Sequence, residues 1–347
     1  KFNCWTPAPL LFLQEMPSNR FVEKKFKSNS DLDQKMDNYI TEYFNNILNS
    51  ADGFEHDYMK SQRLNSRLDY KILNFFKKDL KSYFLDMKHN VGMVFRKKYN
   101  PINPYRYGLI LRMYNQFYRE HNLSKNLYRY SKSINLNDKY VYFPLHFEPE
   151  RTTNPDGGEY HDQFKALVKL RKFVPEQIKI IVKEHPSQIN IAPKGSRGRS
   201  PLFYELISNL KGVELIDLNF NSKKLIKNSE MVATITGTVA LEAAIIGKKS
   251  ITFGSVWYDK TPNIFLFSEV NSYEEINNKP IVKPKYILKH LLEQKNKYTI
   301  IAFQNGSQLR RFESLKNMQF NTIQNSGIKS FIISIINDNL NNNKLWM

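Results

Sequence analysis

Two threonines flank a glycine in the segment Thr236-Gly237-Thr238, which follows an apolar run and precedes a helix-forming stretch. Gly237 has no side chain, so the backbone there can come close to a ligand. The two hydroxyls and the N–H groups at the start of the following helix can hold an anion such as a phosphate. Glu242 lies one helical turn further on, where its carboxylate could accept a sugar hydroxyl. An ordinary helix cap, with Glu242 in solvent, is the alternative.

A second segment with chemical potential is Lys183-Glu184-His185-Pro186, which ends the apolar run 180–182. A buried strand would bring Lys183 and His185 to its carboxyl end, and Pro186 would stop the strand pairing. His185 can donate a hydrogen bond to a phosphate oxygen and help to neutralise a leaving group. The alternative is a histidine that merely occupies a turn.

The segment 143–163 concentrates acidic residues, among them Glu148, Glu150 and Asp156. A sugar hydroxyl needs a nearby carboxylate as general base before it becomes a good nucleophile. A solvated loop punctuated by glycine and proline is the alternative. His146 and His161 match no common metal-ligand spacing, so we predict no metal site.

The segment 194–199 is basic and contains a glycine. It predicts a mobile loop that could close over a phosphate or an anionic acceptor, with Arg199 at its end. A plain solvated loop is the alternative.

These segments need a scaffold, and the chain between residues 139 and 253 supplies an alternating pattern of short strands and helices. Such alternation predicts a parallel sheet that is covered on both faces. Ligands bind at the carboxyl ends of the strands in such sheets, and each motif above falls at one of those ends. The predicted strands are 140–145, 178–182, 213–216, 231–235 and 250–253.

We predict three parts along the chain. Residues 1–138 form a mostly helical acceptor-side domain, with apolar stripes at helical spacing within 32–47, 68–84 and 105–118. Residues 139–282 form the α/β nucleotide-sugar-binding domain, and residues 283–347 form helices and a polar, Asn-rich tail.

Composition narrows the class of protein. The 347 residues include 52 Lys and Arg against 33 Asp and Glu, a formal net charge of +19 that favours anionic partners. The single cysteine, Cys4, excludes a disulfide framework and fits a reducing cytoplasm. No apolar run reaches the roughly 20 residues needed to span a bilayer. The first residue is Lys1, so we expect a chain that is truncated at its start.

With these residues in view, residues 139–262 resemble the capsule polysaccharide synthesis family, which includes the Kdo transferases of capsule export systems. The family is more distantly similar to bacterial sialyltransferases. The resemblance rests on the His-Pro pair at 185–186 and on the Thr-Gly-Thr…Leu-Glu-Ala…Gly-Lys pattern of 236–248. The acidic segment after Tyr-Phe-Pro-Leu-His, which ends at His146, completes it.

The resemblance implies an α/β, GT-B-like fold with two Rossmann-type domains, of which the N-terminal one is largely helical or truncated. It implies an inverting, metal-independent glycosyltransferase without a cofactor. Such an enzyme moves a Kdo-like or sialic-acid-like sugar from a CMP-sugar to a surface polysaccharide or glycolipid acceptor. We expect a cytoplasmic protein whose positive charge favours a further contact with the anionic inner membrane.

The site residues carried over by this resemblance fall into three groups. The predicted general base, lined up from His146, is Glu150, with Glu148 and Asp156 in reserve and His185 at the leaving group. The predicted nucleotide contacts are Lys183, His185, Pro186, Thr236, Gly237, Thr238 and Glu242. The predicted substrate contacts are His146, Arg151 and Arg199.

Two other readings stay open. A transferase with a UDP- or CDP-linked donor, or a UDP-sugar 2-epimerase, would use the same Thr-Gly-Thr turn; an epimerase would normally add a glycine-rich phosphate turn in its N-terminal half. A basic nucleic-acid-binding protein would place aromatic residues among its basic ones on one face. Here the aromatic residues follow helix-core spacing, so we expect no nucleic-acid partner.

Overall fold

The computed structural model describes residues 2–5, 10–13, 30–50, 109–148, 153–190 and 192–301. The described chain forms two compact units. One combines the residues up to 50 with those from Thr238 onwards, and the other runs from 109 to Gly237.

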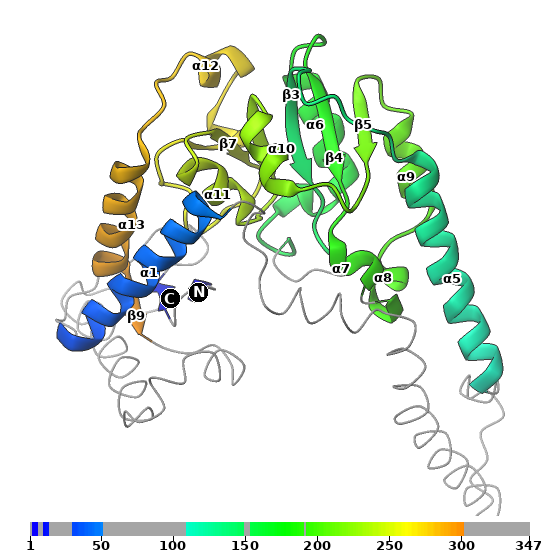
Figure 1. The fold of residues 1–347 in the computed structure, drawn as a ribbon, viewed down its shortest axis with the longest axis horizontal. Helices are drawn as coiled ribbons and strands as arrows, with labels where there is room; N and C mark the ends of the chain where they lie inside the picture. The colour runs from blue at the N-terminus through cyan, green and yellow to red at the C-terminus, as the bar shows by residue number, and fades with distance from the viewer. Residues whose placement is uncertain are drawn as a thin grey trace, which may run out of the picture. The chain divides into compact units, whose positions relative to one another are not determined.

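A parallel sheet forms the centre of the second unit (Figure 1). Its strand order is β5-β4-β3-β6. The strands are β3 (Tyr140–Pro144), β4 (Lys179–Lys183), β5 (Val213–Ile216) and β6 (Met231–Thr234).

These segments form central strands because they are short runs of β-branched and aromatic residues. Val141 of β3, Ile180 of β4 and Val232 of β6 are each fully buried. Burial on both faces explains why the strands are continuously apolar rather than alternating. The predicted α/β class with a parallel sheet is confirmed, and the strands lie within one or two residues of their predicted ends.

Helices connect the strands of this unit. The longest is α5 (Leu109–Tyr130), which packs against α7, α8 and α9. The side chain of Asp162 caps α6 by accepting from the N–H of Phe164 at 2.9 Å. The other helices are η3 (Gly158–His161), α6 (Gln163–Phe173), α7 (Pro186–Asn190), α8 (Ala192–Gly198), α9 (Leu202–Ser208) and α10 (Ser222–Asn228).

The first unit contains the parallel pair β7 (Lys249–Thr252) and β8 (Ile264–Leu266). It also contains an antiparallel sheet with the order β1-β2-β9, formed by Phe2–Trp5, Leu10–Leu13 and Thr299–Ile301. Its helices are α1 (Ser30–Asn49), α11 (Val239–Ile245), α12 (Tyr273–Asn277) and α13 (Pro284–Tyr298), with the short η4 (Phe267–Glu269).

The helix predicted within 68–84 lies outside the described residues, and the division of the chain at 138 and 282 stays a prediction. Among the helices that the structure describes, none is long and apolar enough to cross a membrane.

Candidate functional site

The carboxyl ends of β4, β3 and β6 lie side by side, because β3 pairs in parallel with both of its neighbours. The chain leaves β3 towards His146, β4 towards His185 and β6 towards Thr236. Three residues predicted to belong to the site therefore lie at one edge of the sheet. This is the edge where parallel sheets bind ligands.

His146 joins the end of β3 to the turn after β6. Its Nε2 accepts from the backbone N–H of Thr236 at 3.3 Å and lies 3.1 Å from the hydroxyl of Thr234. An acceptor at Nε2 places the proton of the neutral ring on Nδ1. Burial, followed by the charges of His185 and Arg199, lowers the pKa of His146 to about 3. The ring is therefore neutral at physiological pH and positions the turn.

This burial predicts that stability depends on pH. The pKa of His146 is about 3 when folded, below the ordinary value of 6.5 that the unfolded chain retains, so its contribution is complete above pH 6.5. That contribution is lost as pH falls from 6.5 towards 3, because the unfolded chain binds the proton first. We expect a loss of up to about 5 kcal/mol in the free energy of unfolding over that window. Urea titrations at several pH values measure it, and His146→Gln should flatten the profile.

Gly237 is required by close packing in the same turn. A Cβ atom at this position would lie 2.7 Å from Oγ1 of Thr234 and 3.3 Å from Cε1 of His146. The Thr234 oxygen also accepts the N–H of Gly237 at 3.3 Å, so it has little freedom to move away.

We expect Gly237→Ala to destabilise the fold by about 1–3 kcal/mol through this overpacking, and to weaken ligand binding at the turn. Thermal unfolding and nucleotide titration measure the two effects. Gly158→Ala is the matched control, because its Cβ would meet open space and only its positive φ of 53° would be strained. Equal loss of binding in both variants would contradict a local role for Gly237.

The hydroxyl of Thr236 is buried and has no hydrogen-bond partner among the residues that the structure describes. A buried polar atom without a partner costs about 1–3 kcal/mol, so such atoms are rare in proteins. Each such atom calls for a partner, such as a water, an ion or a ligand. The predicted phosphate turn therefore contains a buried hydroxyl without a partner among the described residues.

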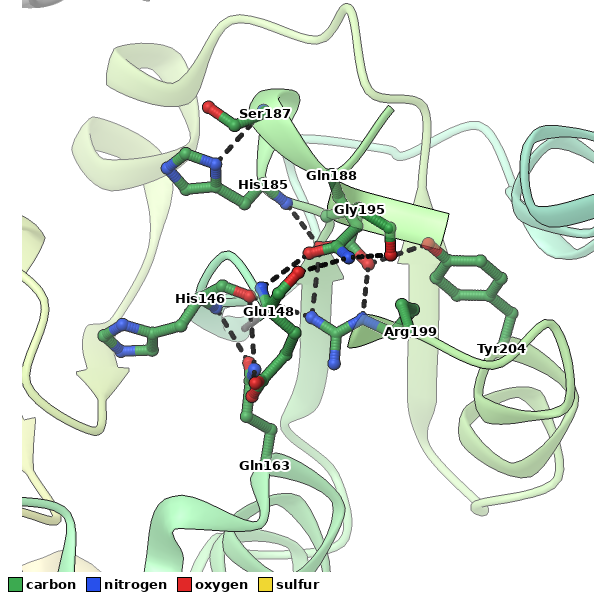
Figure 2. Close-up of polar contacts among 10 residues, drawn as sticks. His146, Glu148, Gln163, His185, Ser187, Gln188, Gly195, Arg199 and Tyr204 are labelled. Atoms are coloured by element: carbon green, nitrogen blue, oxygen red, sulfur yellow. Dashed lines mark hydrogen bonds and ion pairs between the residues drawn. The ribbon is translucent and has the colours of Figure 1, made fainter. Parts of the chain in front are cut away.

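His185 has the opposite tautomer from His146. Its Nδ1 accepts from the backbone N–H of Ser187 at 3.1 Å, so the proton of the neutral ring lies on Nε2. In Figure 2 the rings of His146 and His185 project to the same side of the cluster, away from Arg199 and Tyr204. The Nε2–H of His185 therefore lies at the end of β4, and its contact with a phosphate stays a prediction.

Glu184 fixes the backbone at His185 from behind. Its Oε1 accepts the N–H of His185 at 2.7 Å, and its Oε2 accepts the hydroxyl of Tyr204 at 2.8 Å. Nε of Arg199 lies 3.1 Å from Oε2, and the side chains of this ion pair are 4% and 0% exposed. Burial, followed by the negative charge of Glu184, raises the pKa of Tyr204 above its ordinary value. The end of β4 is therefore anchored by a buried, charge-assisted network.

Arg199 connects this network to β3. Its Nη2 donates to the carbonyl oxygen of His146 at 2.8 Å, and its guanidinium lies 4.3 Å from the ring centroid of Phe203. The predicted mobile loop at 194–199 is wrong, because residues 194–198 lie in α8 and Arg199, which follows it, is 5% exposed. The error arises because a Lys-Gly-Arg composition resembles a solvated loop until a buried acid pairs with its arginine.

Two glutamines hold the segment between His146 and Glu148 from opposite sides (Figure 2). Gln163 accepts the N–H of His146 at 2.7 Å and donates to its carbonyl oxygen at 3.1 Å. Gln188 accepts the N–H of Glu148 at 2.8 Å and donates to its carbonyl oxygen at 3.0 Å. Nε2 of Gln163 also donates to Oε1 of Glu148 at 2.6 Å, which orients that carboxylate.

Comparison with models of protein families gives a match. The family described as "Capsule polysaccharide biosynthesis protein" matches residues 30–261, well over half of the sequence. The chain belongs to this capsule polysaccharide biosynthesis family. A search of curated proteins gives no match.

Solved structures give weaker likenesses. The beta Kdo 2,7 transferase of Thermosulfurimonas dismutans KpsC is 16% identical over 59% of this chain and 65% of its own, with a TM-score of 0.31. The beta Kdo 2,4 transferase of the same protein is 15% identical over 51% of this chain and 53% of its own, with a TM-score of 0.30. The UDP-GlcNAc 2-epimerase of Methanocaldococcus jannaschii is 16% identical over 56% of this chain and 49% of its own, with a TM-score of 0.28. The chain spans less than two thirds of each, and likenesses this weak assign no residue roles.

The acidic candidates of this capsule biosynthesis family member divide into three cases. Glu150, the predicted base, and Arg151 lie outside the described residues. Asp156 is half-buried in the turn before η3. Glu148 is half-exposed at the strand edge, and Gln163 holds its carboxylate. Glu148 therefore contacts Gln163, which also binds the backbone of His146.

Lys183 ends β4, as predicted, but its ammonium group points to protein acceptors. Its Nζ donates to the carbonyl oxygen of Phe220 at 2.6 Å and to the hydroxyl of Ser222 at 2.8 Å. These contacts attach the end of β4 to the start of α10. Pro186 follows as the first residue of α7.

Thr238 and Glu242 belong to the other compact unit of the family member. The hydroxyl of Thr238 donates to Oε1 of Glu242 at 3.4 Å, an i,i+4 contact at the start of α11. Burial is the main cause that raises the pKa values of Tyr43 and Tyr258, and the negative charge of Glu242 is the second. The predicted nucleotide contacts of Thr238 and Glu242 stay predictions.

Sequence reasoning missed the residues that support the site. Gln163, Gln188 and Tyr204 carry no motif, and Thr234 falls inside the predicted strand 231–235. The available signal was position: Gln163 follows the acidic segment and Gln188 follows the His-Pro pair. Glu184 lies between Lys183 and His185 in that motif. Because successive side chains of a strand point to opposite faces, its position indicates that Glu184 points away from the other two.

Proposed function

We propose that this protein is a glycosyltransferase that uses a CMP-activated ulosonic or nonulosonic acid, of the Kdo or sialic-acid type. The acceptor is a surface polysaccharide or glycolipid. Membership of the capsule polysaccharide biosynthesis family supports sugar chemistry. The donor class rests on the motif resemblance and on the chemistry of the site.

The single observation that carries the proposal is the buried hydroxyl of Thr236, which has no hydrogen-bond partner among the described residues and whose own backbone N–H binds the ring of His146. A phosphate oxygen would accept from this hydroxyl and from Nε2–H of His185. His146 itself, neutral and accepting at Nε2, supports the turn and adds no charge. Such prearranged donors act on charge that develops on the leaving group.

The proposed reaction is a single displacement. A carboxylate removes the proton of an acceptor hydroxyl, whose oxygen forms a bond to the anomeric carbon of the donor. The bond from that carbon to the phosphate oxygen breaks, and CMP leaves with the electron pair. The configuration at the anomeric carbon inverts. His185 and Thr236 stabilise the departing phosphate by hydrogen bonding.

We assign the general base to Glu148, because the hydrogen bond from Gln163 at 2.6 Å holds its carboxylate next to His146. Oriented catalytic groups raise rates because less freedom is lost on reaching the transition state. Glu150, the first choice from the sequence, is two residues further on and remains the competing assignment. Asp156 is the third.

A panel of CMP, CDP and UDP in thermal-shift measurements tests the donor. A ligand that binds only the folded state raises the unfolding temperature with its concentration. We expect CMP to give the largest shift. A shift with UDP and none with CMP would instead assign a UDP-linked transferase or a UDP-sugar 2-epimerase.

Thr236→Val gives a sharper test, because valine has the same shape without the hydroxyl. We expect the variant without ligand to be more stable by about 1 kcal/mol, since an unsatisfied buried group is removed. We also expect CMP to bind about tenfold more weakly. Thr234→Val is the control: its hydroxyl contacts His146 and Gly237, so its loss should destabilise the fold. Unchanged CMP affinity in Thr236→Val would place the phosphate elsewhere.

The proposed donor is a cytoplasmic metabolite class, so the reaction is proposed for the cytoplasm. A lipid-linked acceptor would bring the protein to the anionic inner face of the membrane, where its net charge of +19 is favourable.

A further inference from the structure

The outward side of α5 carries a stripe of aromatic and basic residues. Leu123 and Leu127 of this helix are buried at 2% and 0% exposure, and the helix packs against α7, α8 and α9. At 100° per residue, the opposite side collects residues that are spaced three or four apart. The exposed members of this stripe are Tyr118, His121, Lys125, Tyr128 and Arg129.

Acidic residues are scarce along this stripe. Glu120 is the one acid in the sequence of α5, and it is half-buried and falls outside the arc. Burial raises the pKa of Tyr128, and the negative charge of Asp217, near the end of the stripe, is the second cause of the rise. The rest of the face is uncharged or basic. Lys125 and Arg129 therefore give the stripe two positive charges.

The neighbouring helix α9 exposes two leucines, with one exposed acid, Glu205, between them. Leu202 and Leu206 lie one helical turn apart and are 55% and 40% exposed, while Tyr118 and Tyr128 are 55% and 46% exposed. Helices α5 and α9 pack side by side in Figure 1. In the part of this unit that the structure describes, these four are the exposed large hydrophobic residues.

We propose that this face of α5 and α9 docks on an anionic lipid surface. Tyrosine prefers the membrane interface, where its ring is apolar and its hydroxyl is wet. Lysine and arginine are drawn to anionic headgroups, and exposed leucines can enter the boundary of the acyl chains. A nucleic acid would use the same basic groups but would gain nothing from two leucines. The proposal goes beyond the transferase assignment and holds whichever nucleotide the site takes.

Sedimentation with vesicles tests the surface on the full chain. We expect binding to phosphatidylglycerol-containing vesicles, little binding to pure phosphatidylcholine vesicles, and loss of binding at high salt. Lys125→Gln with Arg129→Gln should weaken binding at least tenfold. Tyr118→Ser with Tyr128→Ser should weaken it several-fold while leaving the net charge unchanged.

The matched control lies on α13 in the other unit. Lys285→Gln with Lys289→Gln removes the same charge from an exposed helix, and Tyr286→Ser removes a tyrosine of 53% exposure. We expect these variants to bind vesicles like the unaltered protein. Equal losses in α5 and α13 variants would show a diffuse charge effect and overturn the proposal. Retained vesicle binding in the α5 variants, or loss of single-stranded DNA binding in its place, would overturn it too. Circular dichroism confirms that each variant is folded.

Discussion

Replacing Glu184 with alanine is expected to lower the free energy of unfolding by about 3–5 kcal/mol, because it leaves a buried charge without its partner. Arg199 is 5% exposed and would lose both of its contacts to the carboxylate. The hydroxyl of Tyr204 and the N–H of His185 would lose their acceptor as well. Urea unfolding, followed by circular dichroism, measures the change through the midpoint and the slope.

A double-variant cycle separates the pair from its parts. Arg199→Met keeps much of the side-chain volume without the charge, so we expect Glu184→Ala with Arg199→Met to be more stable than Glu184→Ala alone. Arg199→Lys keeps the charge but not the fork of donors, so it should fall between the unaltered protein and Arg199→Met. Strictly additive effects would mean that the ion pair does not act as a unit.

The same network explains which parts of the fold could be predicted from the sequence. Strands such as β4 were predictable because residues 180–182 are apolar on both faces, as a covered parallel strand requires. The convergence of the two motifs was also predictable, because the ends of parallel strands meet at one edge. Both inferences use local pattern and general topology.

The role of Arg199 was not predictable in this way. Its environment depends on Glu184, which is 15 residues away along the chain, and on the carbonyl oxygen of His146, which is 53 residues away. Local composition at 194–199 favours a loop, and the burial energy of a tertiary ion pair is not visible there. An arginine assigned to substrate from sequence thus lies inside the protein.

The two histidines show the same limit at atomic scale. Sequence reasoning assigned His185 to the leaving group and His146 to a substrate contact, but it could not show how either ring is held. Their hydrogen bonds show this: Nε2 of His146 accepts from Thr236, whereas Nδ1 of His185 accepts from Ser187. One ring therefore supports the turn, and the other presents a donor.

Changing His185 to alanine and Glu148 to glutamine should both abolish most sugar transfer, for different reasons. Loss of a general base lowers the rate by about 10²- to 10⁴-fold. The amide introduced by Glu148→Gln keeps an acceptor oxygen for Gln163, so the segment should stay in place and CMP affinity should be unchanged. His185→Ala removes the proposed phosphate donor, so it should weaken CMP binding at least tenfold in addition to slowing transfer.

Turnover with a CMP-sugar and calorimetric titration with CMP distinguish these outcomes. Gln163→Leu is the control for the orientation of the Glu148 carboxylate. Without the Gln163 amide, the carboxylate of Glu148 keeps its charge but loses the bond that orients it, so the maximal rate should fall with little change in CMP affinity. Glu150→Gln is measured in parallel. Full activity in Glu148→Gln with none in Glu150→Gln would move the base two residues along the chain. Full activity in both variants would show that neither carboxylate is the base. Unchanged CMP affinity in His185→Ala would show that His185 does not contact the phosphate.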